Sequence, residues 1–472
     1  MKTFNSTIAV WAALCAAWPL LAQAQSAGQQ ANTGNPGGLQ IDLGVSSSLS
    51  IDDNFQLSPN SGGTSTIFDN TLTFDLSSIT PTQDLRLFGS TVLRYADIPG
   101  RTMSGFEDPL LRLSYRLQAV DSEFTLSARY RRSDRDFLDP FQVEQEEQLL
   151  AGTGLFAGGG TLTVRNASIG YRTGINAPLG FQITVTHDEK SYEDLSILNT
   201  RLFDTRTDSV NAVVTARISP VAVLDFDLGY SDYSADDSVQ TERQTLTYGI
   251  GAVYDINPVL VLDARLGWTE IDIADTNGTR SRSGASGLLK LTRTLPTGSI
   301  FASVDSTVNT TGTRTSLRFG RDLQLPRGAL SASLGVTRTP AGNTDWNSAV
   351  SYSHNLASST LTVSLRRDVS TNNLDEEIVD TRLALGYDYQ INSVSSLNVT
   401  LNYGRSASAD DLSTVPTVTR TTLRAAYSRS LTRDWAMTTG IQLRDRKDSS
   451  ATGDARSNAV FMTLGRTFSY RP

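Results

Sequence analysis

Charged side chains alternate with apolar ones over most of this sequence, and they are the residues whose types and spacing allow chemistry. Arg carries a planar fork of hydrogen-bond donors that suits carboxylate and phosphate groups. Asp supplies matching acceptors. The candidates on the polar positions are Arg86, Arg94, Arg112, Arg116, Arg129, Asp225, Asp227, Asp263, Arg265, Arg366, Arg382, Asp388, Arg424 and Arg444.

These candidates allow two interpretations. In the first, they line a wide, water-filled lumen with charges that compensate one another. In the second, the Arg-rich strands near the start of the chain form a cationic wall that conducts an anionic sugar polymer. Arg112, Arg116 and Arg129 are the residues to test first, because they lie close together in one predicted hairpin.

A catalytic centre is the competing chemistry, and the chain has two His residues with which to build one. His187 is followed by Asp188, but neighbouring residues of a strand point to opposite faces, so Asp188 is badly placed to orient His187. The acidic pair Asp52-Asp53 lacks the alternate spacing of a calcium loop. We therefore expect no enzyme activity, no metal site and no cofactor.

The elements that position the candidates are strands. From Leu111 to Arg131, apolar and polar residues alternate on both sides of a break at Ala119–Ser122, which predicts a β-hairpin with one apolar and one polar face. The same pattern recurs to the end of the chain in segments of about 10 to 15 residues, the length of tilted transmembrane strands. A change of phase between Val164 and Ile169 predicts a β-bulge.

Loop lengths distinguish a membrane barrel from a soluble sandwich. Short connections such as Thr80–Gln83 and Asn257–Pro258 alternate with longer ones such as Asp97–Gly105, Ser133–Gly159 and Ile271–Thr279. Outer-membrane barrels have short periplasmic turns and long outer loops, whereas a sandwich has no reason to sort loops by side. The fold class is therefore all-β, a transmembrane antiparallel up-and-down barrel of about 22 strands (18–24), with both termini in the periplasm.

The first residues have the pattern of an export signal. Lys2 precedes an apolar stretch, and Ala22-Gln23-Ala24 is a cleavage sequence, so residues 1–24 are predicted to be removed between Ala24 and Gln25. Residues 25–38 are polar and Gly-rich, which predicts a flexible periplasmic leader, and 39–472 form a single barrel. The only cysteine, Cys15, belongs to the signal, so the mature chain has no disulfide.

Two segments resemble known outer-membrane proteins. The last strand, Val460 to Tyr470, resembles the C-terminal strand that the barrel-assembly machinery recognises, with Phe468 and Tyr470 as the insertion signal, although Arg471 and Pro472 follow it. The segment Leu49–Phe55 resembles the opening motif of a Gram-negative outer-membrane β-barrel porin family associated with exopolysaccharide secretion, with Ile51 at a usually aromatic position. The resemblance implies polysaccharide export.

The expected function is an outer-membrane channel for hydrophilic solutes or secreted polysaccharide. The alternative is a structural or adhesive barrel whose outer loops bind partners while the lumen stays closed. The leader is too short for a plug domain, so the connection Ser133–Gly159, folded inward, is the candidate for blocking the pore. The expected partners are outer-membrane lipid, the assembly machinery and a polysaccharide secretion system or anionic polysaccharide. No nucleic-acid partner is expected.

Overall fold

The computed structural model describes residues 38–138, 160–194, 202–372, 375–409, 417–449 and 454–471. The predicted signal, the cleavage site at Ala24 and Gln25, and all of the leader except Gly38 lie outside the described residues. So does most of the Ser133–Gly159 connection. No helix in the described ranges is long and apolar enough to cross a membrane.

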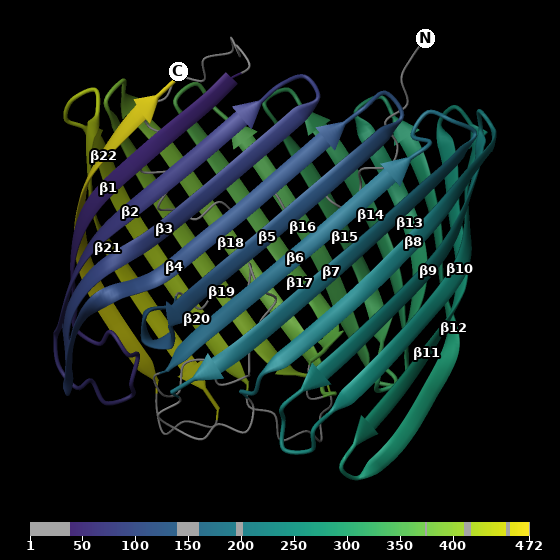
Figure 1. Cartoon of the computed structure of the whole chain (residues 1–472), viewed down its shortest axis with the longest axis horizontal. Coiled ribbons are helices and arrows are strands. Elements are labelled where there is room, and N and C mark those ends of the chain that lie inside the picture. Colours follow the sequence, from purple (N-terminus) through teal and green to yellow (C-terminus); the bar gives the residue numbers. More distant parts are fainter. Residues whose placement is uncertain are drawn as a thin grey trace.

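One antiparallel sheet of 22 strands makes up the molecule (Figure 1). Each strand pairs with its sequence neighbours, and a short 3-10 helix, η1 (Arg135–Phe137), follows the fifth strand. The strands are β1 (Gly38–Asp52), β2 (Ser65–Ile79), β3 (Gln83–Ile98), β4 (Arg101–Gln118), β5 (Ser122–Asp134), β6 (Thr161–Thr173), β7 (Leu179–Glu193), β8 (Thr205–Ser219), β9 (Ala222–Ala235), β10 (Glu242–Asn257), β11 (Leu260–Asp275), β12 (Gly278–Leu295), β13 (Gly298–Val308), β14 (Thr313–Leu325), β15 (Gly328–Arg338), β16 (Thr344–Asn355), β17 (Ser359–Thr371), β18 (Glu377–Asn392), β19 (Ser395–Ser408), β20 (Val418–Ser430), β21 (Trp435–Asp448) and β22 (Ala455–Tyr470).

The sheet closes on itself through β1 and β22. Their antiparallel register runs from Ile41 opposite Tyr470 to Asp52 opposite Ala459. Closure pairs the backbone groups of the first and last strands, which would cost several kcal/mol each if left unpaired in hydrocarbon. The predicted closed barrel and its even strand number are confirmed, and the start of β1 and the end of β22 lie at one rim (Figure 1).

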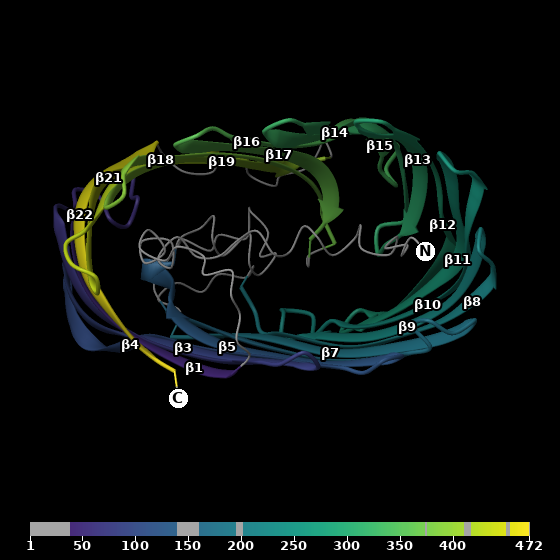
Figure 2. The ribbon, with the colours of Figure 1, turned by 90° about the horizontal axis from the view of Figure 1, so that it is seen from above.

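Most exposed apolar residues of the strands lie on the outer face. In the Leu111–Arg131 hairpin, Leu111 is the cross-strand partner of Tyr130, and their side chains are 50% and 37% exposed. Exposed Leu, Val, Ile, Phe and Tyr side chains recur on nearly every strand. Viewed along its axis the barrel has an oval outline (Figure 2).

The short turns lie where the sequence predicts them, but two of the predicted long loops are wrong. Only Pro99 and Gly100 separate β3 from β4, and only Thr276 and Asn277 separate β11 from β12. In both places the strands themselves continue beyond the barrel, and the β11–β12 hairpin projects past the rim (Figure 1). Polar residues at this rim thus extend the sheet instead of forming irregular loops.

The predicted bulge between Val164 and Ile169 is also wrong. The register of β6 with β5 and with β7 is continuous through these residues. Leu162 and Val164 are instead buried with Leu202 on the inner face, whereas Ile169 is exposed on the outer face. The change of phase therefore marks the point where the strand leaves the lipid-facing belt and packs against a loop.

A real irregularity occurs in β4. Ser90 and Val92 of β3 pair with Leu110 and Glu107, so β4 carries one additional residue there. Asp108 within this bulge has a left-handed backbone (φ 51°). Pro109, which follows, has no N–H to lose from the ladder. The bulge turns the Asp108 carboxylate toward β3.

Candidate solute pathway

The sequence-predicted candidates all lie on strands, at positions that alternate with the exposed apolar side chains. Arg112, for example, lies between Leu111 and Leu113, and in the strand register it is opposite Arg129. Alternation places the whole set on the inner face: Arg86, Arg94, Arg112, Arg116, Arg129, Asp225, Asp227, Asp263, Arg265, Arg366, Arg382, Asp388, Arg424 and Arg444.

Most candidate arginines have a carboxylate partner. The pairs are Arg86–Asp84 at 3.0 Å, Arg116–Glu123 at 2.6 Å, Arg265–Asp263 at 3.2 Å, Arg366–Asp368 at 3.0 Å and Arg382–Asp380 at 3.9 Å. Arg112 and Arg129 are also engaged in polar contacts. A wall of compensated charge therefore describes this face better than a bare cationic wall.

Two candidate carboxylates have neutral hydrogen-bond donors. Asp225 accepts a hydrogen bond from Thr215, and Asp388 accepts one from Asn398, both at 2.7 Å. The Arg424 guanidinium lies 4.4 Å from the centre of the Phe461 ring.

Arg94 is the centre of a buried group that we call the rim cluster: Phe55, Asp69, Arg94, Asp108 and Phe137. The Arg94 side chain is 6% exposed and contacts both Asp69 and Asp108 at 2.9 Å. Its guanidinium lies 3.8 Å from the centre of the Phe137 ring, which itself packs on Phe55 at 5.0 Å. The cluster therefore joins η1 and the β1–β2 loop to the inner wall.

The segment Asp52-Asp53-Asn54 locks the seam between the first and last strands. Asp52 accepts hydrogen bonds from Arg444 at 2.6 Å and from Ser457 at 2.7 Å. Asn54 donates to the carbonyl of Arg456 at 2.9 Å. The motif that carried the family resemblance thus has a structural role here, and Arg444 belongs to that seam.

Asp53 extends this seam on the exposed side. Its carboxylate accepts two hydrogen bonds from Asn458, both at 2.7 Å, one from the backbone N–H and one from the side chain. These hydrogen bonds lower the pKa of Asp53 below its usual range.

A second inward structure lies across the barrel. Pairing of β16 with β17 stops at Ser348 and Arg367, whereas β17 and β18 remain paired to Thr371 and Glu377, so this hairpin separates from the wall and turns inward (Figure 2). At its tip Asp375 contacts Arg280 of β12 at 2.9 Å and Arg243 of β10 at 3.7 Å.

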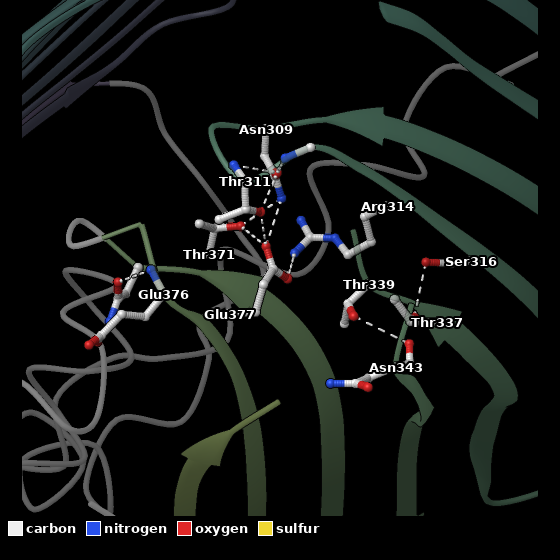
Figure 3. A network of polar contacts seen from close by, with 12 residues as sticks. Asn309, Thr311, Arg314, Ser316, Thr337, Thr339, Asn343, Thr371, Glu376 and Glu377 are labelled. Atoms are coloured by element: carbon white, nitrogen blue, oxygen red, sulfur yellow. Dashed lines mark hydrogen bonds and ion pairs between the residues drawn. The ribbon is translucent and has the colours of Figure 1, made fainter. Parts of the chain in front are cut away.

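Glu377 fixes the same hairpin next to its tip (Figure 3). Its carboxylate accepts hydrogen bonds from Asn309 at 2.9 Å, from Thr311 and Thr371 at 2.6 Å each, and from Arg314 at 3.2 Å. We call these residues together with Arg243, Arg280 and Asp375 the strap network.

His187 has a partner that the sequence argument missed. Its Nδ1 lies 2.6 Å from the carboxylate of Asp208 on the adjacent strand, so an Asp does orient it, although that Asp is not Asp188. His187 alternates with Val185 on the outer face, and its other contact is Glu189 at 3.7 Å. Among the described residues its partners are carboxylates, so the geometry supplies no nucleophile for hydrolysis.

Phe468 and Tyr470, the predicted insertion signal, are 46% and 62% exposed near the end of β22. Phe468 pairs across the seam with Leu43, and the Arg466 guanidinium lies 4.3 Å from its ring centre. Their recognition by the assembly machinery stays a prediction.

Sequence reasoning missed Asp108, Phe137, Asp375 and Glu377. A signal existed for Asp108, because the apolar phase differs between Phe106 and Leu111 by one residue. No local signal announces Asp375, whose partner Arg280 is separated from it by 95 residues.

Comparison with known proteins gives a result at the level of the fold. No protein-family model matches this chain, and no curated protein is similar to it. Among solved structures, the iron transporter FrpB of Neisseria meningitidis (F3-3 variant) is similar over 92% of this chain and 82% of its own, with 10% identity and a TM-score of 0.58.

Two further matches come from Pseudomonas aeruginosa. A ferric enterobactin receptor (PfeA, Q482A mutant, in complex with enterobactin) has a TM-score of 0.55 at 10% identity, over 92% of this chain and 82% of that one. The siderophore receptor PirA has a TM-score of 0.50 at 10% identity, with coverages of 92% and 81%. The chain therefore has the fold of Gram-negative outer-membrane receptors, and the expected link to exopolysaccharide secretion has no support in these comparisons.

Proposed function

We propose that this protein is an outer-membrane barrel that passes hydrophilic solutes. The observation that carries the proposal is a closed sheet of 22 strands with an apolar outer face and a charged inner face. Charged side chains facing lipid near the midplane cost several kcal/mol, whereas a water-filled lumen accommodates them. The neighbours named as iron transporters and siderophore receptors support a transport role by analogy of fold.

Whether the lumen is open is the central question for this proposal. Barrels of this strand number are typically plugged transporters. Here the β17–β18 hairpin and the segment with η1 both turn inward from the wall (Figure 2). This arrangement agrees better with a narrow pathway for small solutes than with a wide conduit for a polymer. Secreted polysaccharide is the alternative substrate.

Planar-bilayer conductance tests the proposal. We expect discrete channel openings, and an ion selectivity that shifts toward cations when Arg112, Arg116 and Arg129 are replaced together by Gln. The matched control replaces Arg165 and Arg206, which lie on the outer face, and its selectivity should equal that of the wild type.

Silence in the bilayer contradicts the channel and favours the adhesive alternative, in which outer loops bind partners over a closed lumen. An unchanged selectivity in the triple variant removes the three arginines from the pathway while leaving the channel itself intact. Recovery of the folded protein from the soluble periplasmic fraction contradicts both functions.

A further inference from the structure

A hollow of about 660 Å³ lies in the inner wall across β9 to β14. Side chains from successive strands face it: Asp227, Arg265, Lys290, Phe301, Asp305 and Arg318. Its volume is within the range of sites for small organic ligands. The hollow is remote in sequence from both the rim cluster and the seam.

Glycines line part of this hollow and leave it free of side chains there. Gly249 and Gly267 are direct cross-strand partners, and Asp227 lies opposite Gly249 on the other side. A β-carbon on Gly249 would lie 3.1 Å from the Asp227 carboxylate. Glycine weakens a strand interior, and it is typical of places where a ligand or another backbone approaches closely.

The charges around the hollow are partly unmatched. Arg318 pairs with Asp305 at 2.8 Å and Arg265 with Asp263 at 3.2 Å, and their side chains remain 45% and 50% exposed. Among the described residues, no carboxylate forms an ion pair with Lys290, whose ammonium lies 4.8 Å from the centre of the Phe301 ring. Likewise, no described cation or hydrogen-bond donor contacts Asp227.

From these observations we propose that the hollow is a binding subsite for small hydroxylated carboxylates. The unmatched Lys290 ammonium, beside two exposed guanidiniums, binds the carboxylate of the ligand. Asp227, together with Thr247, Ser286 and Ser303, exchanges hydrogen bonds with its hydroxyl groups. The inference deepens the proposed function, on which it rests, because it names the class of solute that the wall of the pathway retains.

Calorimetric titration of the full chain in detergent tests the subsite without requiring an open pore. The probe is D-gluconate, and the comparison ligands are sorbitol, which lacks the carboxylate, and hexanoate, which lacks the hydroxyls. We expect gluconate to bind and both comparison ligands to bind about tenfold more weakly or less, since a charged hydrogen bond contributes about that factor.

Variants assign the binding to this hollow. Lys290→Met should weaken gluconate binding about tenfold or more, Lys290→Arg should restore most of it, and Asp227→Asn should reduce the preference for gluconate over hexanoate. The control Lys447→Met removes an exposed Lys that lies outside the candidate pathway residues, paired with Asp454, and should leave gluconate binding unchanged.

The proposal is overturned if gluconate fails to bind the wild type, if sorbitol binds equally well, or if Lys290→Met binds like the control. Gluconate binding by a protein that is silent in the bilayer supports the subsite and contradicts the channel. A conducting protein with no gluconate affinity gives the reverse result, so the two failures are distinguishable.

Discussion

The rim cluster and the strap network both hold an inward-turned segment against the barrel, but with different chemistry. The rim cluster buries Arg94 between two carboxylates and the Phe137 ring, with 6% of its side chain exposed. In the strap network the Arg280 side chain that meets Asp375 is 60% exposed. Buried charges are costly to leave unpaired, whereas exposed pairs contribute little. The first region should therefore determine stability and the second the width of the mouth.

The largest effect is expected at Arg94. Replacing Arg94 by Ala leaves Asp69 and Asp108 without their shared cation in a buried site, and we expect the free energy of unfolding to fall by about 3–5 kcal/mol. Urea unfolding of the refolded protein in detergent, followed by tryptophan fluorescence, measures the change.

The control for this variant is Arg86→Ala, which removes an exposed inner arginine of the same strand, paired with Asp84. It should cost less than about 1 kcal/mol. Equal effects of the two substitutions would show that burial of the rim cluster does not determine its contribution.

A smaller effect is expected at Glu377, the buried part of the strap network, whose side chain is 9% exposed. Glu377→Gln keeps the shape but removes the charge that accepts from Arg314, and we expect a loss of about 1.5–3 kcal/mol. Hydrogen exchange should speed up in residues 309–314 and 375–377, and not at η1. Faster exchange at η1 as well would mean that the two regions are coupled.

A substitution at Asp375 should change the conductance of the pore while leaving the stability of the protein nearly unchanged. Asp375→Asn breaks the contacts with Arg280 and Arg243. Because Arg280, the nearer partner, is 60% exposed and Asp375 itself is only partly buried, we expect a change in stability below about 1 kcal/mol. Conductance should nevertheless rise, since the hairpin tip is no longer held across the mouth. In the wild type, the conductance divided by the conductivity of the bulk solution should rise likewise at high salt, which screens the pairs. A stable variant with wild-type conductance would show that the strap does not limit the pathway.

These two regions also show what the sequence can and cannot predict. Strand alternation predicted the strands, their approximate number and the inner face of Arg94, because each follows from residues two apart. The alternation of short and long connections was needed to predict a barrel instead of a sandwich. The partners of Arg94 depend on a bulge at Asp108 and on Phe137, which arrives from a later loop. Asp375 meets Arg280 only because β17 and β18 leave the wall, a tertiary event without a local pattern.

The smallest effect on stability is expected at Asp53, an exposed carboxylate of the seam. Asp53 lies in the same loop as Phe55 of the rim cluster, yet its carboxylate is exposed and held by hydrogen bonds from Asn458. Its folded pKa is lowered, so it contributes stability above the unfolded value of about 3.9, and this contribution is lost as the pH falls through the folded pKa.

Asp53→Asn should therefore lower the free energy of unfolding slightly at neutral pH. It should also make this free energy fall less steeply below about pH 4, and Asn458→Ala should reduce the slope in the same way. Unfolding midpoints measured from pH 3 to pH 7 provide the test. If Asp53→Asn reduces the free energy of unfolding as much as Arg94→Ala does, then position at this rim, and not burial, determines how much a charge contributes to stability. If it costs as little as Asp375→Asn, then an exposed carboxylate and one that is 25% exposed contribute equally little, and the nearly complete burial of Arg94 accounts for the larger effect there.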